Sequence, residues 1–390
     1  MISVSEAIQH IENYCQPNKI IEKPIQEVLG LVLAEAIVSP INMPPFKQSS
    51  MDGYAFIHNE ISSFTVVGEV QAGDSKNVVL QEGEAVRIFT GARVPDQADT
   101  VVMQEHTSVE GDQLTINELP KKSSNVRPLG EQIKTGAIAL EEGTVLNEAA
   151  IGFIAGLGLS TVKVYQKPKV SILITGNELK AVGEVLEEGQ VYDSNSITLQ
   201  LALHRLGIDE VEIVKVEDTF EATKTAIKNQ LDFADVILVS GGISVGDYDF
   251  VKRGLEENNV SEVFYKVNQK PGKPLWFGEK EEKLVFALPG NPASSLSCFY
   301  SYVLPVIKAQ LGYKDYHLPR STAKATNDIK NAFGKTLFLK GIIENGQATQ
   351  LTGQASSMLK SFAVANGLLI VPEDVQEIKK GEEITYIKLS

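Results

Sequence analysis

The chain has 390 residues, enough for two to four domains, and its 43% hydrophobic and 22% charged residues are typical of a folded soluble protein. A formal net charge of −14 argues against a general nucleic-acid-binding protein. No run approaches the ~20 apolar residues of a membrane-spanning helix, and no export signal is evident, so we expect a cytoplasmic protein without membrane contact.

The first half of the chain predicts a helix, a β-domain and a second helix. Helical spacing of apolar residues indicates an amphipathic helix over residues 3–15, capped by Ser3 or Ser5. Short alternating runs over about residues 44–126, separated by Gly, Asp and Asn, predict a small barrel or sandwich. Helical character returns at residues 147–157.

The second half predicts an α/β region followed by a β-domain. Over about residues 167–312, four continuous apolar strands alternate with helices, which indicates a parallel sheet covered on both faces. These strands are SILIT, VEIVKV, DVILVS and KLVFAL. After Pro319, alternating runs predict a C-terminal β-domain of about 70 residues. The predicted fold class is therefore multidomain α/β plus β.

Polar loops follow the carboxyl ends of these four strands, where parallel sheets bind ligands. The glycine-rich run after DVILV can bring backbone N–H groups to a phosphate, although such a run also fits an ordinary tight turn. Four carboxylates in these loops would repel one another without a cation, and Mg²⁺ on substrate phosphates is the natural candidate. They are Glu178, Asp218, Asp247 and Asp249. Each one alone also fits a helix cap or a solvated side chain.

Positive charge gathers in one segment of this acidic chain. Lys266, Lys270 and Lys273 lie within eight residues, and Pro271 and Pro274 stiffen the same loop. This pattern predicts an anion site, with a solvated basic hairpin as the alternative. A further unusual segment is PPFKQSSMDGYA, where Pro-Pro favours an extended approach and Asp-Gly marks a turn. It also fits a linker between domains.

Taken together, these segments resemble the MoeA family of molybdopterin molybdenumtransferases, which includes the E domain of gephyrin. The matching stretches, in family order, are PPFKQSSMDGYA, RIFTGARVPDQADTVVMQE, SILITGNEL, GQVYDSNS, VSGGISVGDYDFVK, KPGKP and LPGNPASS. The resemblance implies an elongated domain from residues 1–43 and 137–166, and an inserted β-domain over 44–136. It further implies an adenylyltransferase-like, molybdopterin-binding α/β domain over 167–316 and a C-terminal β-domain over 317–390.

The resemblance also implies roles for individual residues. Matching its motifs assigns a catalytic set of Asp52, Thr90, Asp218, Lys266 and Lys270. Together with the glycine-rich loop, it predicts a substrate-binding set of Gly241, Gly242, Ser244, Lys273, Pro289, Pro292 and Ser294. The metal-binding residues are expected to be Glu178 and Asp249.

The implied reaction inserts molybdate into adenylylated molybdopterin, with Mg²⁺, and yields molybdenum cofactor and AMP. Molybdenum is held there by the dithiolene of the pterin, which suits a chain with only two cysteines. The expected assembly is a homodimer with a shared active site, with possible contact to the molybdopterin adenylyltransferase. Two alternatives stay open, namely the adenylyltransferase step itself and a non-catalytic, gephyrin-like scaffold.

Some positions depart from the family pattern. Lys47 and Gln48 stand where the family often has Asp-Asn, and Gln132 replaces an acid used in some members. Lys335 and Lys340 stand where arginines are frequent, and lysine cannot bind an anion in the bidentate manner of arginine. These departures bear on molybdate affinity and on contacts between subunits.

Overall fold

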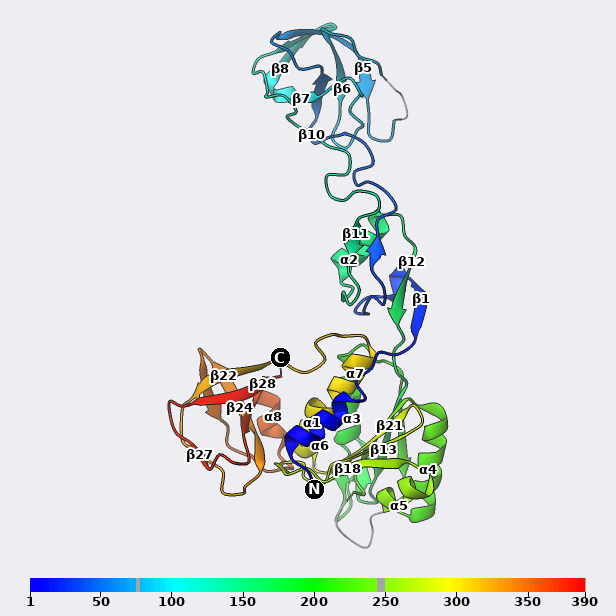
Figure 1. Cartoon of the computed structure of the whole chain (residues 1–390), viewed down its shortest axis with the longest axis vertical. Coiled ribbons are helices and arrows are strands. Elements are labelled where there is room, and N and C mark those ends of the chain that lie inside the picture. Colours follow the sequence, from blue (N-terminus) through cyan, green and yellow to red (C-terminus); the bar gives the residue numbers. More distant parts are fainter. Residues whose placement is uncertain (75–77, 244–249, 390) are drawn as a thin grey trace. The chain divides into compact units, whose positions relative to one another are not determined.

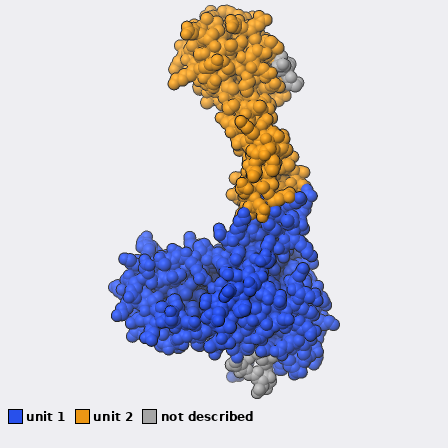
Figure 2. Space-filling model, viewed as in Figure 1, with its two compact units in different colours: residues 1–23, 30–34, 163–390 blue, residues 24–29, 35–162 orange. Residues whose placement is uncertain are grey.

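The computed structural model describes residues 1–74, 78–243 and 250–389, and the chain divides into two compact units (Figures 1 and 2). Unit 1 consists of Met1–Lys23, Gly30–Ala34 and Lys163–Ser390, and unit 2 of Pro24–Leu29 and Glu35–Val162. Within the described ranges, no helix is both long and apolar enough to cross a bilayer. The predicted multidomain α/β plus β fold is confirmed, as the following elements show.

Helix α1 (Val4–Glu12) confirms the helix predicted near the N-terminus, and Ser3 is its N-cap. The Ser3 hydroxyl accepts a hydrogen bond from the Glu6 N–H at 3.2 Å, while Glu6 Oε2 accepts one from the Ser3 N–H at 2.7 Å. This reciprocal capping box satisfies N–H groups that have no partner inside the helix. The start of the helix is therefore fixed by its own sequence.

The apolar side of α1 packs against the α/β part of unit 1. Ala7 and Ile11 are fully buried in the core of that part, and the Ile2 N–H donates to Lys266 O at 3.0 Å. Residues 1–23 belong to unit 1, where α1 buries its apolar face. The elongated domain from residues 1–43 and 137–166, which the family resemblance implied, stays a prediction.

A six-stranded sheet forms the centre of the α/β part, in the order β16-β13-β17-β21-β20-β18 (Figure 1). Its first four strands pair in parallel, as their continuous apolar sequences predicted. They are β16 (Val211–Val216), β13 (Val170–Thr175), β17 (Val236–Ser240) and β21 (Lys283–Leu288). Every residue of β13 and β17 is buried, so these central strands are covered on both faces.

Helices contribute to two separate cores around this sheet. One core contains residues of α4 (Phe220–Phe233) and α5 (Phe250–Glu257). The other contains residues of α1, α3 (Asn195–His204), α6 (Pro292–Cys298) and α7 (Leu304–Gln310). A π-helical stretch, Phe299–Val303, connects α6 to α7. The helical segments predicted between the strands are thus confirmed.

Two antiparallel strands at the edge of the sheet were not predicted. β20 (Trp276–Lys280) pairs with β21 on one side and with β18 (Ser261–Tyr265) on the other. Gly278 interrupts the apolar run of β20, and a Cβ at this position would lie 2.4 Å from Ser261 O on the neighbouring strand. The connection between β18 and β20 carries the three lysines predicted to bind an anion.

The C-terminal part of unit 1 is a closed β-sheet. The strand order is β24-β25-β22-β28-β26, and β26 pairs again with β24. Four strands confirm predicted runs, namely β24 (Thr336–Glu344), β25 (Gln347–Gln350), β26 (Gly367–Val371) and β28 (Glu383–Lys388). Elements that were not predicted include β22 (Arg320–Ala325), helix α8 (Leu359–Val364) and the short pair β23 (Ile329–Lys330) and β27 (Glu377–Ile378).

A shared core joins this barrel to the α/β part. Ala293 and Leu296 of α6 pack in one cluster with Phe338 of β24, Phe362 of α8 and Ile387 of β28. In addition, β19 (Gln269–Lys270), which follows β18, pairs in parallel with β24. These contacts fix the barrel against α6 and against the lysine-bearing connection.

Unit 2 contains the β-domain predicted over about residues 44–126. Its six-stranded sheet has the order β7-β4-β6-β5-β9-β8. The bounds are β4 (Gly53–Phe56), β5 (Ser63–Val70), β6 (Glu84–Ile88), β7 (Thr100–Met103), β8 (Thr107–Glu110) and β9 (Gln113–Ile116). Helix α2 (Glu148–Gly156) confirms the second predicted helix.

Short ladders complete unit 2 by pairing segments from before and after the β-domain. They are β2 (Ile37–Val38) with β11 (Ile138–Leu140) and β3 (Gln48–Ser49) with β10 (Val126–Arg127). A further ladder pairs β1 (Ile20–Pro24) with β12 (Thr161–Tyr165), and most residues of both strands belong to unit 1.

Candidate active site

A crevice of about 660 Å³ lies at the carboxyl ends of the parallel strands of unit 1. Its walls come from the segments that follow β13, β16, β17 and β21, from the start of α3, and from single residues of two other loops. The lining residues are Thr175, Gly176, Glu178, Leu179, Val191, Tyr192, Asp193, Ser194, Asn195, Asp218, Ser240, Gly241, Gly242, Ile243, Pro274, Pro289, Gly290, Asn291, Pro292 and Ser357.

The crevice lies where the strand order of the sheet reverses. From β13 the chain adds β16 on one side, and then crosses to add β17 and β21 on the other side. The loops after β13 and β17 therefore leave the sheet in opposite directions, which opens a crevice at their carboxyl ends. This topology explains why residues distant in sequence meet here.

Glycines let the loop after β17 lie directly on the end of β13. Gly241 has φ +94°, and a Cβ on it would lie 2.6 Å from Thr175 O. Gly242 has φ +63°, and a Cβ there would lie 2.7 Å from Thr175 Oγ1. Any larger residue would push the two loops apart. Among the described residues, the buried Thr175 hydroxyl has no hydrogen-bond partner, so this wall of the crevice keeps a free polar group.

Two of the predicted acidic residues, Glu178 and Asp218, line the crevice together. The Asn177 side chain links their loops, because its Oδ1 accepts the Asp218 N–H at 3.2 Å. The Glu178 carboxylate folds back over Gly176, where a Cβ would lie 2.8 Å from Oε2. Asp249, the other predicted metal ligand, lies outside the described residues together with Asp247 and the predicted substrate residue Ser244.

This donor set fits Mg²⁺. The described ranges contain no cluster of three or more His, Cys, Asp or Glu side chains suited to a protein-only metal site. Magnesium needs no such cluster, since it is usually held by one or two carboxylates together with substrate phosphates and water. Glu178 and Asp218 supply two carboxylates beside an open crevice.

Asp193 and Asn195 line the crevice but were not among the predicted site residues. Asp193 caps α3, since its Oδ1 accepts the N–H groups of Asn195 at 3.0 Å and Ser196 at 3.1 Å. Asn195 Nδ2 donates to Ser240 Oγ and to Gly290 O, both at 2.8 Å. Asn195 thus joins the last residue of β17 to the loop after β21. The sequence carried no signal for this bridge.

The predicted lysines lie on the connection next to the crevice, and only Pro274 of this connection lines it. Lys270 and Lys273 are exposed, and the Lys270 ammonium lies 3.4 Å from the centroid of the Phe333 ring. Lys266 is half-buried, and its ammonium lies 4.5 Å from the centroid of the Tyr265 ring. The structure therefore places the three lysines on one connection, with two of their ammonium groups on aromatic rings.

A buried network of polar side chains holds the backbone of the connection that carries the lysines. The Gln269 side chain donates to Gly272 O at 3.1 Å and to Cys298 Sγ at 3.4 Å, and it accepts a hydrogen bond from the Tyr302 hydroxyl. Gln269, Cys298 and Tyr302 are all 1% exposed or less. Since Gly272 lies between Lys270 and Lys273, this network fixes the backbone that carries both ammonium groups.

The network predicts a stability effect. We expect Tyr302→Phe to lower the free energy of unfolding by about 1–3 kcal/mol, because Gln269 Oε1 would lose its partner in the core. The single tryptophan, Trp276, is fully buried in the same part of unit 1, so its fluorescence during urea denaturation reports the relevant transition. Tyr313→Phe, which removes a longer bond to Gly30 O (3.4 Å), is the matched control. If Tyr302→Phe and Tyr313→Phe lowered the free energy of unfolding equally, the stabilising role of the hydrogen bond between Tyr302 and Gln269 would be contradicted.

The loop after β21 contributes Pro289 and Pro292, two of the predicted substrate-binding residues, to the lining of the crevice. Ser294 does not line it and is 2% exposed. The N–H groups of Ala293 and Ser294, at the start of α6, donate to Ser356 O at 3.0 and 3.2 Å. The backbone of the loop before α8 is thus hydrogen-bonded to the N-terminus of α6. The next residue, Ser357, lines the crevice, although the sequence did not single it out.

Asp52 and Thr90, predicted to be functional, are paired within unit 2. Asp52 Oδ1 accepts the Thr90 N–H and the Thr90 hydroxyl, both at 2.7 Å. These hydrogen bonds hold the pKa of Asp52 below its usual value, with a smaller contribution from Arg87. The Arg87 guanidinium lies between the rings of Tyr54 and Phe89, at 5.2 and 4.8 Å. Asp52 is consequently a fixed anion beside an ordered arginine.

Neither cysteine offers a thiolate at neutral pH. Burial raises the pKa of Cys15 and of Cys298 to about 12. A thiol with such a pKa stays protonated near pH 7 and is a poor metal ligand. Bound molybdenum would therefore have to receive its sulfur ligands from another source.

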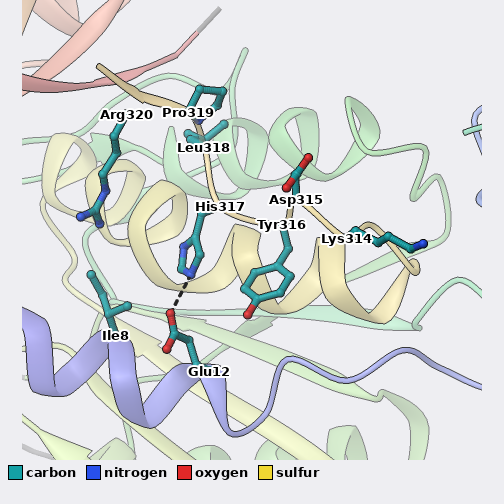
Figure 3. A pocket seen from close by; sticks show the side chains of 9 residues that line it. All are labelled: Ile8, Glu12, Lys314, Asp315, Tyr316, His317, Leu318, Pro319 and Arg320. Atoms are coloured by element: carbon teal, nitrogen blue, oxygen red, sulfur yellow. Dashed lines mark hydrogen bonds and ion pairs between the residues drawn. The ribbon is translucent and has the colours of Figure 1, made fainter. Parts of the chain in front are cut away.

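A second cavity, of about 710 Å³, lies between α1 and the segment that leads into the barrel (Figure 3). Ile8 and Glu12 of α1 face residues 314–320, and Nε2 of His317 lies 3.3 Å from Oε1 of Glu12 (Figure 3). The predicted site residues and the lining of this cavity have no member in common. The chemistry therefore points to the crevice at the strand ends.

Three family descriptions match consecutive parts of the chain. "MoeA N-terminal region (domain I and II)" matches residues 2–158, "Probable molybdopterin binding domain" matches residues 171–309, and "MoeA C-terminal region (domain IV)" matches residues 322–389. The second description covers most of the described crevice, and the third covers the barrel with Ser357.

Relatives match nearly the whole length of the chain. A molybdopterin molybdenumtransferase from Haemophilus influenzae is 38% identical over 375 residues, which cover 93% of this chain and 92% of the relative. Molybdopterin molybdenumtransferase 2 from Mycobacterium tuberculosis is 31% identical and covers 98% of both chains. The crystal structure of a molybdopterin biosynthesis MoeA protein from Pyrococcus horikoshii has a TM-score of 0.87 at 29% identity, covering 100% of this chain and 99% of the other.

Proposed function

The chain belongs to the MoeA family, and from this premise we propose that it is a molybdopterin molybdenumtransferase that inserts molybdate into adenylylated molybdopterin. The products are molybdenum cofactor and AMP. The observation that supports this most directly is the crevice at the strand ends, where Glu178 and Asp218 share the lining with a glycine-rich loop and the loop after β21. Such a site suits a phosphoanhydride held together with a divalent cation.

We propose that Mg²⁺ is held by Glu178 and Asp218, which line the crevice, together with Asp249, the other predicted metal ligand, which lies outside the described residues. When bound, the ion would neutralise negative charge on the anhydride and on the departing AMP. Gly241 and Gly242 let their backbone come close to a ligand, since neither carries a side chain. Asn195 holds the end of β17 to the loop after β21 and so maintains the width of the crevice.

Lys270 and Lys273 are proposed to bind the molybdate dianion at the edge of the crevice, next to Pro274. Ammonium groups suit this task because charge-assisted hydrogen bonds to an oxyanion are stronger than neutral ones. Lys266 is proposed to add to the positive field of this connection. The Ser294 side chain is less suited than the sequence indicated, since that residue is buried and does not line the crevice.

The homodimer with a shared active site stays a prediction of the family resemblance. In that arrangement Asp52 and Thr90 would act on substrate bound to a second subunit. Asp52 suits an orienting role better than proton abstraction, because its lowered pKa makes it a weak base. Contact with the molybdopterin adenylyltransferase likewise stays a prediction.

One experiment separates this function from its alternatives. The purified chain is incubated with adenylylated molybdopterin, molybdate and Mg²⁺, and both AMP release and reconstitution of a cofactor-free molybdoenzyme are measured. We expect both signals, each dependent on molybdate. Turnover of ATP and molybdopterin instead would indicate the adenylyltransferase step, and no turnover of either substrate pair would favour a scaffold.

A further inference from the structure

Lys340 is a buried lysine on the face of β24 that packs against α6 and α8, opposite the core of the barrel. Its side chain is 1% exposed and lies on β24, between apolar neighbours of the same strand. Its ammonium donates to three backbone carbonyl oxygens, those of Gly353 at 2.9 Å, Ala355 at 3.2 Å and Met358 at 3.2 Å. An ammonium has three N–H donors, so these bonds use all of them and require the protonated form.

The three carbonyl groups belong to one loop, Gly353–Met358, which the ammonium holds against β24. Two further side chains fix the same loop. Gln354 Oε1 accepts the Lys340 N–H at 3.0 Å, and its Nε2 donates to Lys340 O at 2.8 Å. The Ser361 hydroxyl donates its single hydrogen to Gly353 O at 2.6 Å, and Met358 O lies 3.2 Å from the same hydroxyl oxygen. The carbonyl groups of this loop therefore point inward to partners of their own.

The same loop reaches the candidate active site. Ser356 O accepts the N–H groups of Ala293 and Ser294 at the start of α6, and the exposed Ser357 lines the crevice. A chain of contacts thus runs from the Lys340 ammonium, through the loop backbone, to the crevice wall. Lys340 itself does not line the crevice, and all three of its donors are used by the loop.

Resting on the proposed function, we propose that Lys340 is a positioning residue, which holds the Gly353–Met358 loop so that Ser357 completes the substrate crevice. Arginine at this position would present five donors in a planar fork and suit an exposed anion. A lysine ammonium suits three converging carbonyl groups instead. Burial lowers the pKa of Lys340, so the carbonyl groups must compensate for part of the cost of an enclosed cation.

The first test needs no substrate. Amide hydrogen exchange is compared between the parent protein, Lys340→Met and Lys324→Met. Lys324 is an exposed lysine on β22 of the same barrel and serves as the matched control. We expect Lys340→Met to raise exchange at least about tenfold in the loop and at the Ala293 and Ser294 amides, because three hydrogen bonds to the loop are removed. Unchanged exchange at these amides would overturn the proposal.

The second test asks whether Lys340 acts through Ser357. Values of kcat and KM for AMP release are measured for Lys340→Met, Ser357→Ala and the double variant. We expect Lys340→Met to lower kcat/KM about tenfold, mainly through KM, and Ser357→Ala to lower it about fivefold. If the two act through one loop, the double variant loses no more than Lys340→Met alone. A loss equal to the product of the single losses, or an unchanged kcat/KM in Lys340→Met, would overturn the proposal.

Ser361→Ala provides a milder route if Lys340→Met does not fold. It removes a hydroxyl that lies within hydrogen-bond distance of two of the same carbonyl oxygens, and it leaves the ammonium in place. We expect Ser361→Ala to exchange its loop amides faster than the parent protein and to raise KM less than Lys340→Met does. If neither value changed, the loop would not be the link between Lys340 and the crevice. If the parent protein released no AMP, the proposed function would fail, while the exchange experiment would still decide whether Lys340 holds the loop.

Discussion

Glu178→Gln is expected to lower Mg²⁺-dependent AMP release at least about 100-fold at limiting Mg²⁺, since even indirect partners of a metal contribute about 10–100-fold. The substitution keeps the size of the side chain and its fold over Gly176 while removing the charge. Loss of one of two crevice carboxylates weakens the binding of a cation that depends on both. The measurement is the initial rate of AMP release over a Mg²⁺ titration, with the half-saturating concentration as the decisive quantity.

The pattern of recovery separates a metal ligand from a residue with a structural role. Raising Mg²⁺ is expected to restore part of the rate in Glu178→Gln. Glu184→Gln, an exposed carboxylate that does not line the crevice, serves as the control and should match the parent protein. A lower rate with an unchanged half-saturating Mg²⁺ concentration would contradict the role of Glu178 as a ligand.

The parallel core could be predicted because its physical signal is local. A strand buried on both faces must be apolar at each position, and β13 and β17 come close to that condition over their whole length. The edge strands β18 and β20 gave a weaker signal, because Gly278 breaks one run and a proline-rich connection separates the pair. The barrel strand β22, with the sequence RSTAKA, buries only two alanines and so lacks an apolar pattern.

The crevice was partly predictable for a similar reason. Glu178, Asp218 and Pro289 each follow a strand end, so the sheet topology alone places them at one edge. Ser357 enters from the barrel, and its position depends on Ser356 O meeting the first N–H groups of α6. Such a contact joins chain segments more than 60 residues apart. Pattern and spacing carry no information on pairings of this kind.

Lys340 shows why a buried charge escapes sequence reasoning. In the run TLFLKGII a lysine indicates a solvated face, because lysine is rarely buried without partners. Its partners are main-chain carbonyl groups, which every residue possesses, so no side chain of the loop marks the contact. For Gln132 the sequence shows a departure from the family pattern, but the structure does not explain it. The backbone N–H of Gln132 donates to Met43 O at 2.9 Å, and this contact gives no information on the function of the side chain.

Lys270→Met is expected to raise the KM for molybdate about 10–100-fold, with a much smaller effect on the affinity for AMP. A charge-assisted hydrogen bond contributes about 1.5–3 kcal/mol, which corresponds to that range in affinity. The Lys270 ammonium now lies 3.4 Å from the Phe333 ring centroid, and Phe333 is 52% exposed. A cation–π interaction at such an exposed site contributes only about 0.5–1 kcal/mol. A dianion can therefore displace the ring as the partner of Lys270.

This competition makes the role of Lys270 testable beyond a single substitution. Phe333→Leu should leave the KM for molybdate within about threefold of the parent value, because the cation–π interaction with the ring is weaker than a charge-assisted hydrogen bond to the dianion. Lys270→Arg keeps the charge and should recover part of the affinity, whereas Lys280→Met, on β20, should leave it unchanged. If Lys270→Met and the parent protein had the same KM for molybdate, the ammonium would be a solvated group that rests on Phe333, and the anion site would have to lie elsewhere along the crevice.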